Sequence, residues 1–147
     1  RRQHGLLIGP RTAEELKISL GCARPLRTVQ TMAVKGRDLA SGFPRSLTLS
    51  SDEVQAALAD SVRLVLEGVL HALEKTPPEL ASDIVDRGIV LTGGGALLHG
   101  MDRALRETTG VPVIVAEDPL AVVVGGSARM LEGRLETETT GLRMNVG

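Results

Sequence analysis

The sequence predicts an α/β fold in two parts, a small α+β unit over residues 1–76 and an α/β unit over residues 77–133. In the first part, two β-rich runs flank a Gly-Phe-Pro tip, which is typical of a hairpin. In the second part, apolar runs alternate with helical patterns through short loops, which indicates a parallel sheet with crossover helices. Residues 134–147 include few apolar side chains, and we expect a flexible tail there.

The first part opens with a short helix in the stretch "TAEELKISLG". Thr12 and Glu15 have the spacing of a capping box, so we expect the helix to begin at this pair. Gly21 follows the last helical residue, at the place where a glycine in the left-handed conformation commonly ends a helix. The helix is therefore predicted to be short and to end at Gly21.

A hairpin and a long helix complete the first part. The runs "RTVQTMAVKG" and "SLTLS" predict two strands, and "RDLASGFPR" joins them. Phe43, at the hairpin tip, is expected to be exposed, either as a contact for a partner or simply as a turn residue. Ser50 and Glu53 have the capping-box spacing again, and apolar residues then follow a helical period to about Lys75.

The second part begins where "TPPEL" breaks the long helix and starts a short one, which reaches about Asp86. The apolar run "GIVLT" predicts a strand buried on both faces. After three glycines, "LLHGMDRALRETTG" predicts a helix closed by Gly110. A second apolar strand, "VPVIVAE", leads through Asp118-Pro119 to the helix in "DPLAVVVGGSARMLEG".

Composition excludes several classes of function. The chain has 17 basic and 18 acidic residues for a net charge of −1, with one Phe and neither Trp nor Tyr, so we expect no nucleic-acid partner. A single cysteine, Cys22, excludes an internal disulfide and multi-cysteine metal sites, and three scattered histidines predict no metal ligands. Because no apolar run reaches the roughly 18 residues of a membrane span, we expect a cytoplasmic chain. Its start on Arg1 favours a piece of a longer protein.

The stretch "LTGGGALLHG" contains the strongest local motif. It is neither a Walker loop nor G-x-G-x-x-G, so the residues alone leave two readings open: a tight strand-to-helix turn or a ligand-binding loop. Glycines after a buried strand lie where open α/β sheets bind ligands, and without Cβ atoms a flat group can contact the backbone. Glu117 or Asp118, at the next helix start, is expected to cap that helix rather than to act in catalysis.

Three long stretches together resemble a known family. "LLIGPRTAEELKISLG", "VKGRDLASGFPRSLTLSSDEV" and "LEKTPPELASDIVDRGIVLTGGGALLHGMDRALRETTGVPVIVAEDPL" are similar, in order and spacing, to the carboxyl-terminal half of the MreB/Mbl family of bacterial actin-like, rod-shape-determining proteins. The resemblance covers about residues 1–133. It implies the second lobe of an actin-like ATPase (ribonuclease H-like) fold, with subdomain IIB in residues 1–76 and the latter part of subdomain IIA in residues 77–133.

The same resemblance implies a nucleotide site. In this family the triple glycine lies against the adenosine and the α-phosphate side of ATP, and the short helix near the start of the chain forms the opposite wall. Its carboxylate and its lysine, one turn apart, are then expected to reach the ribose hydroxyls or the base, although a solvated ion pair is the simpler alternative. The implied cofactor-binding residues are Glu14, Lys17, Gly93, Gly94, Gly95 and Ala96.

The resemblance also implies the role of the whole protein. Its members hydrolyse ATP bound with Mg²⁺ and assemble head to tail into cytoplasmic filaments that organise cell-wall synthesis and cell shape. The implied partners are further copies of the chain and the cell-wall elongation machinery, and the membrane is reached only through an amino-terminal region absent here. The Mg²⁺ ligands and phosphate hairpins also lie upstream, so we expect no catalytic residue and no ATP hydrolysis in this stretch alone.

One departure from the family pattern leaves alternatives open. Where the family usually has Thr and Cys after "AEDPL", this chain has Ala121 and Val122, which removes polar side chains from that position. A non-catalytic scaffold that has lost its nucleotide is one alternative reading. A lobe of a sugar or acetate-type kinase from the same superfamily is another, although residues 22–76 contain no obvious cluster of substrate-binding polar groups.

Overall fold

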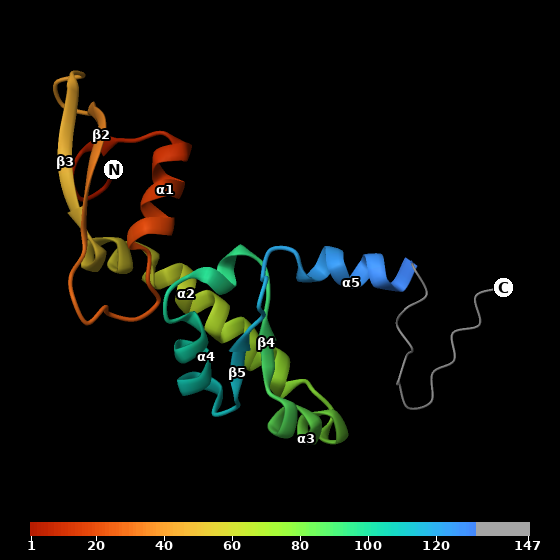
Figure 1. Cartoon of the computed structure of the whole chain (residues 1–147). Helices are drawn as coiled ribbons and strands as arrows, with labels where there is room; N and C mark the ends of the chain where they lie inside the picture. Colours follow the sequence, from red (N-terminus) through yellow and green to blue (C-terminus); the bar gives the residue numbers. More distant parts are fainter. Residues whose placement is uncertain (132–147) are drawn as a thin grey trace.

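The structure of the chain, a computed structural model, describes residues 1–131, so the predicted tail over 134–147 lies outside the described residues. An upper part holds the hairpin and the first helix, and a lower part holds a small sheet packed against helices (Figure 1). Within residues 1–131, none of the helices combines the length and the apolar composition that crossing a bilayer requires.

The upper part is an antiparallel sheet flanked by one helix. Its elements are β1 (Leu6–Leu7), α1 (Pro10–Leu20), β2 (Thr31–Asp38) and β3 (Pro44–Ser50), with the strands in the order β1-β2-β3. The β2–β3 hairpin confirms the predicted one, and its tip is the far end of the molecule (Figure 1). Asp38 holds this tip by accepting hydrogen bonds from the Ala40 and Ser41 amides, each at 2.9 Å. Phe43 is exposed there, as expected.

The two predicted capping boxes had opposite outcomes. At the start of α2 (Ser51–Glu74), the Ser50 hydroxyl accepts from the Glu53 amide and the Glu53 carboxylate accepts from the Ser50 amide, which confirms the second box. These bonds from Ser50 also hold the pKa of Glu53 below its ordinary value. The box at Thr12 and Glu15 is wrong, because α1 already begins at Pro10, a residue well suited to a first helical position.

The lower part contains a parallel pair of strands, as predicted. It consists of α3 (Pro78–Arg87), β4 (Ile89–Leu91), the 3₁₀ turn η1 (Gly94–Leu97), α4 (Met101–Thr109), β5 (Val113–Val115) and α5 (Val122–Leu131). β4 pairs with β5 in parallel. The helix predicted after the glycines begins later than expected, because Gly100 adopts a φ of 75° and separates η1 from α4. Gly110 closes α4 in the left-handed conformation, as predicted.

The main core lies between α2, α4 and one face of the β4–β5 sheet. Its buried residues are Val62, Met101, Leu105 and Val113, and partly buried apolar side chains from α2, β4 and neighbouring loops pack around them. Helix α2 therefore belongs to both parts of the molecule: its first turn joins the hairpin sheet, and its later turns cover β4 and β5. The division at residue 76 stays a prediction.

The opposite face of the β4–β5 sheet is open. Val90 is 54% exposed and Ile114 is 58% exposed, so the expectation that the "GIVLT" strand is buried on both faces is wrong for this chain. The reason is that α2 and α4 lie on the same side of the sheet, while α5 extends away from it instead of packing as a crossover helix (Figure 1). Most residues of α5 are exposed.

Candidate functional site

The glycine loop lies at the carboxyl end of β4 and is anchored to the segment that follows β5. The Gly93 amide donates to the Pro119 carbonyl at 2.6 Å, and the Ala116 amide donates to the Leu91 carbonyl at 3.1 Å. Gly93 has a φ of 78°, a conformation that favours glycine, and Ala96 is buried. The start of the loop is thus held against the segment after β5, and Gly93 has a conformational reason to be glycine.

Gly94 and Gly95 differ from Gly93, because neither has a positive φ. A Cβ on Gly95 would meet no atom within 4 Å, and a Cβ on Gly94 would make only an ordinary contact, 3.8 Å from Leu120. Both residues begin η1, where backbone amides have no intrahelical carbonyl to bond. Among the described residues, neither the backbone nor the packing requires glycine at these two positions, and the space above them is free for another group.

The predicted pair on α1 is present as an ion pair. The Lys17 Nζ lies 2.8 Å from the Glu14 Oε2, and both side chains are about half exposed, at 48% and 56%. Ile18, next on this helix, is 73% exposed. The pair is therefore accessible to a ligand, and the two side chains hold each other in place. It has the geometry of the simpler alternative, a solvated ion pair between residues one helical turn apart.

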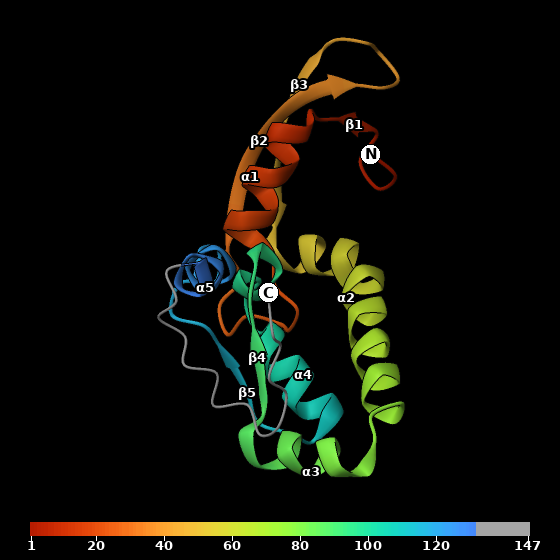
Figure 2. The same cartoon turned by 90° about the vertical axis from the view of Figure 1, so that its right-hand side faces the viewer.

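The end of α1 is joined directly to the residues after the glycine loop. The Ala23 amide donates to the His99 carbonyl at 2.8 Å, and Cys22 forms a parallel bridge with His99. Gly21 has extended backbone rather than the predicted left-handed one, yet a Cβ there would lie 2.2 Å from the Lys17 carbonyl oxygen. Glycine is needed at this position because of that close approach. As a result the carboxyl end of α1 lies beside Leu98, and Figure 2 shows α1 with that end toward the lower part of the molecule.

A groove of the described residues lies elsewhere. It has a volume of about 600 Å³ and runs between the amino-terminal turn, α1 and α2, with His4, Lys17 and Glu53 among its lining residues. Of the six predicted site residues, only Lys17 lines it. The structure thus gathers Glu14 and Lys17 in one pair, and Gly93 to Ala96 in one loop. That the two sets line a single ligand stays a prediction.

Other polar groups near the loop have structural roles. Asp118 accepts a hydrogen bond from the Ala121 amide at 3.2 Å, and its carbonyl accepts from the Val122 amide, so it caps the start of α5 as expected. Burial raises the pKa of the Cys22 thiol, which keeps it protonated and unreactive. Within residues 1–131, no group of three His, Cys, Asp or Glu side chains is arranged to hold a metal ion.

Sequence reasoning missed two neighbours of the loop, Pro119 and Leu120. The sequence did indicate their position, because they follow the second strand of a predicted parallel pair. The carboxyl ends of such strands meet at one edge of a sheet, so residues after the two strands are expected to be neighbours. The contact between His99 and the segment after α1 had no such signal, since it joins residues far apart in the sequence that share no motif.

Comparisons with known proteins agree with one another. The family described as MreB/Mbl protein matches residues 1–139. The cell shape-determining protein MreB of Escherichia coli K12 is 52% identical over 132 residues, which are 90% of this chain and 38% of that protein. The cell shape-determining protein Mbl of Bacillus subtilis 168 is 46% identical over 90% of this chain and 40% of its own length. This chain therefore spans well under half the length of these relatives.

Solved structures give the same picture. MreB5 of Spiroplasma citri bound to ADP superimposes with a TM-score of 0.86 at 33% identity, over 90% of this chain and 40% of that one. The same protein bound to AMPPNP gives a TM-score of 0.82 at 32% identity. A double helical filament of MamK gives 0.68 at 21% identity over 89% of this chain, and at that identity the likeness concerns the fold alone.

Proposed function

The chain belongs to the MreB/Mbl family and has part of the actin-like fold, and from this premise we propose that it supplies the adenosine side of an ATP site in a filament-forming cytoskeletal protein. The observation on which the proposal rests is the pair Gly94 and Gly95. Neither residue needs to be glycine for its own conformation or for packing among the described residues. A bound ligand in contact with the backbone would explain why both positions are glycine. A planar nucleoside fits that requirement.

The residues around this space suit a nucleotide. In the proposed complex Gly93, Gly94, Gly95 and Ala96 lie against adenosine and the α-phosphate side. The Glu14 carboxylate accepts hydrogen bonds from the ribose hydroxyls, and Lys17, 2.8 Å away, orients that carboxylate. Ile18 offers an exposed apolar side chain for the base. Mg²⁺ is proposed to come with ATP or ADP, held by groups outside residues 1–131.

The relatives support the ligand. MreB5 of Spiroplasma citri is solved with ADP and with AMPPNP. We propose that the whole protein binds and hydrolyses ATP, assembles head to tail with copies of itself, and works in the cytoplasm with the cell-wall elongation machinery, next to the membrane. A role in cell shape follows from the names of its relatives.

Titration calorimetry of this chain with Mg-ATP tests the site. We expect the unmodified chain to bind and Gly94→Val to bind at least about ten-fold more weakly, because a branched side chain fills the space meant for the ligand; a ten-fold loss is about 1.4 kcal/mol. Gly68→Val is the matched control, since Gly68 also has open space around its Cβ position but lies in α2. If Gly68→Val weakens binding as much as Gly94→Val, the loop has no special role.

Pelleting of a protein extended to the length of its relatives tests the assembly. ATP-dependent sedimentation is expected for a filament protein. Turnover of ATP with a small acceptor, without sedimentation, would instead indicate a superfamily kinase. A protein that sediments but has no measurable nucleotide affinity would be a scaffold. If no binding is found with the present chain, the same titration on the longer protein decides whether the loop is only a turn.

A further inference from the structure

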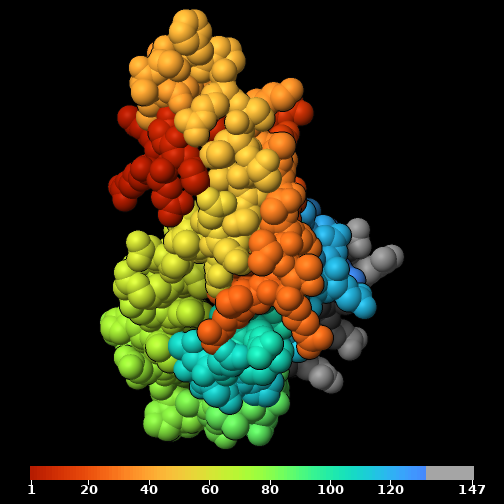
Figure 3. Space-filling view, turned by 90° about the vertical axis from the view of Figure 1, so that its left-hand side faces the viewer, coloured from red at the N-terminus to blue at the C-terminus, as the bar shows by residue number. Residues whose placement is uncertain are grey.

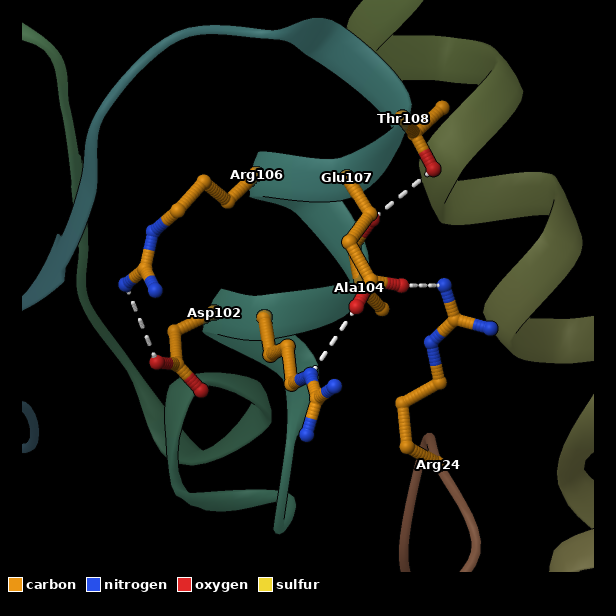
Figure 4. A network of polar contacts seen from close by, with 7 residues as sticks. Arg24, Asp102, Ala104, Arg106, Glu107 and Thr108 are labelled. Carbon is orange, nitrogen blue, oxygen red and sulfur yellow. Dashed lines mark hydrogen bonds and ion pairs between the residues drawn. The ribbon is translucent and has the colours of Figure 1, made fainter.

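The two proposed walls of the nucleotide site are connected by one side-chain contact across the molecule. Arg24 lies in the segment after α1, and its guanidinium forms an ion pair with Glu107 on α4 (Figure 4). Helix α1 carries Glu14 and Lys17, while α4 follows the glycine loop. This ion pair therefore joins the segment next to one wall to the helix next to the other.

The backbone next to Arg24 also contacts the residues that lead into α4. Its Cβ lies 3.3 Å from where a Cβ on Gly100 would stand, so the stem of Arg24 covers the glycine that joins η1 to α4. One residue earlier, the Ala23 amide donates to the His99 carbonyl at 2.8 Å. Figure 3 shows the segment after α1 (orange) lying directly against α4 (teal). Side chain and backbone thus hold the same two segments together.

Glu107 also pairs with a second arginine. The Arg103 Nε lies 2.9 Å from the Glu107 Oε1, one turn earlier on α4, while Arg24 bonds the other carboxylate oxygen. The contact with Arg24 therefore uses a carboxylate oxygen that Arg103 leaves free. Arg103 stays within α4 and makes no link to the other wall, so the two arginines share one partner but have different roles.

We propose that Arg24 is a positioning residue for the nucleotide site: through Glu107, in the last turn of α4, it fixes the segment after α1 against that helix, and so fixes the spacing between the Glu14–Lys17 pair and the glycine loop. This inference rests on the proposed function. It assigns Arg24 no contact with the ligand. Its effect on affinity comes from keeping the two walls apart by the right distance before the ligand arrives.

The test compares Arg24→Ala and Glu107→Gln with Arg103→Ala as the matched control, in this chain, with two readouts. Mg-ATP affinity is measured by calorimetry, and exchange of the Ala23 amide by NMR without nucleotide, relative to the hairpin amide of Asp38, which donates to the Phe43 carbonyl. Because the ion pair is partly exposed, we expect Arg24→Ala and Glu107→Gln each to weaken affinity, and to speed Ala23 exchange, by about three-fold. Arg103→Ala should change neither.

Two further variants separate positioning from general stability. The double variant Arg24→Ala with Glu107→Gln should lose no more than either single one, because both remove the same contact. Arg24→Lys should recover most of the loss, since it keeps a cation within reach of Glu107. Additive losses, or faster exchange at Ala23 and Asp38 alike, would overturn the proposal. So would faster Ala23 exchange with unchanged affinity.

The failure of the proposed function would look different. If the unmodified chain binds no nucleotide, the site itself is in question, and Arg24 then positions nothing for a ligand. The exchange experiment still decides whether Arg24 joins the two segments: equal Ala23 exchange in Arg24→Ala and Arg103→Ala would show that it does not.

Discussion

The two faces of the β4–β5 sheet have similar apolar sequences but very different surroundings. Ile89, Leu91 and Val113 point toward α2 and α4 and take part in the core, while the adjacent residues Val90 and Ile114 are more than half exposed. A strand with apolar residues on both faces is typical of a parallel sheet covered on both sides. The relatives of this chain extend well beyond it, and the open face is where further structure of a longer protein would pack.

The covered face should be the more sensitive to mutation, and Leu105 tests it most directly. Its side chain is 1% exposed and packs with Val62, Met101 and Val113. We expect Leu105→Ala to lower the free energy of unfolding by about 2–5 kcal/mol, because it removes buried methyl groups and leaves a cavity. Urea denaturation followed by circular dichroism measures this. A loss below about 1 kcal/mol would mean that the core between α2 and α4 is not the main one.

The outcome of the sequence analysis depended on how local each signal was. The Ser50–Glu53 box, the hairpin and the parallel pair of strands involve neighbouring residues or a simple pattern, and they were predicted correctly. The start of α1 was not, because Pro10 competed with the Thr12 box and no pattern ranked one over the other. The exposed second face of β4 was not predicted, because an apolar strand does not show which elements pack on it, and within residues 1–131 that face is open.

The candidate site shows the same distinction. The glycine loop was found because three glycines after an apolar run are visible in the sequence itself. Gly21 was noticed for the wrong reason: its backbone is extended, and what requires glycine is the approach of the Lys17 carbonyl. The Arg24–Glu107 contact was not found, because the two residues are 83 positions apart and arginine and glutamate are common on any surface.

Helix α2 lies on the covered face of the β4–β5 sheet, and its start depends on the Ser50 cap. Removing this cap should have an intermediate effect on the free energy of unfolding. Ser50→Ala removes the acceptor for the Glu53 amide, and we expect a loss of about 1 kcal/mol in the free energy of unfolding. Thr12→Ala is the matched control, since Thr12 has capping-box spacing in the sequence but lies inside α1. Equal losses from both variants in thermal denaturation would contradict the assignment of the two helix starts.

Substitutions on the open face should have the smallest effect on the free energy of unfolding and the largest effect on self-association. Ile114 is exposed on this face with Val90, so Ile114→Thr, which keeps a β-branched side chain, should change the free energy of unfolding by less than about 0.5 kcal/mol. An exposed apolar face with strand edges beside it favours self-association, so we expect the chain to dimerise or aggregate and Ile114→Thr to reduce this.

Analytical ultracentrifugation at several concentrations distinguishes the open face from isolated apolar residues. Phe43→Ala is the matched control, because Phe43 is 73% exposed but stands alone at the hairpin tip, far from the β4–β5 sheet (Figure 1). If association falls with Ile114→Thr but persists with Phe43→Ala, the associating surface is the open face of the β4–β5 sheet. A chain that stays monomeric at high concentration would mean that the open face is too small or too well hydrated to drive association. The difference between the two faces would then lie in stability alone.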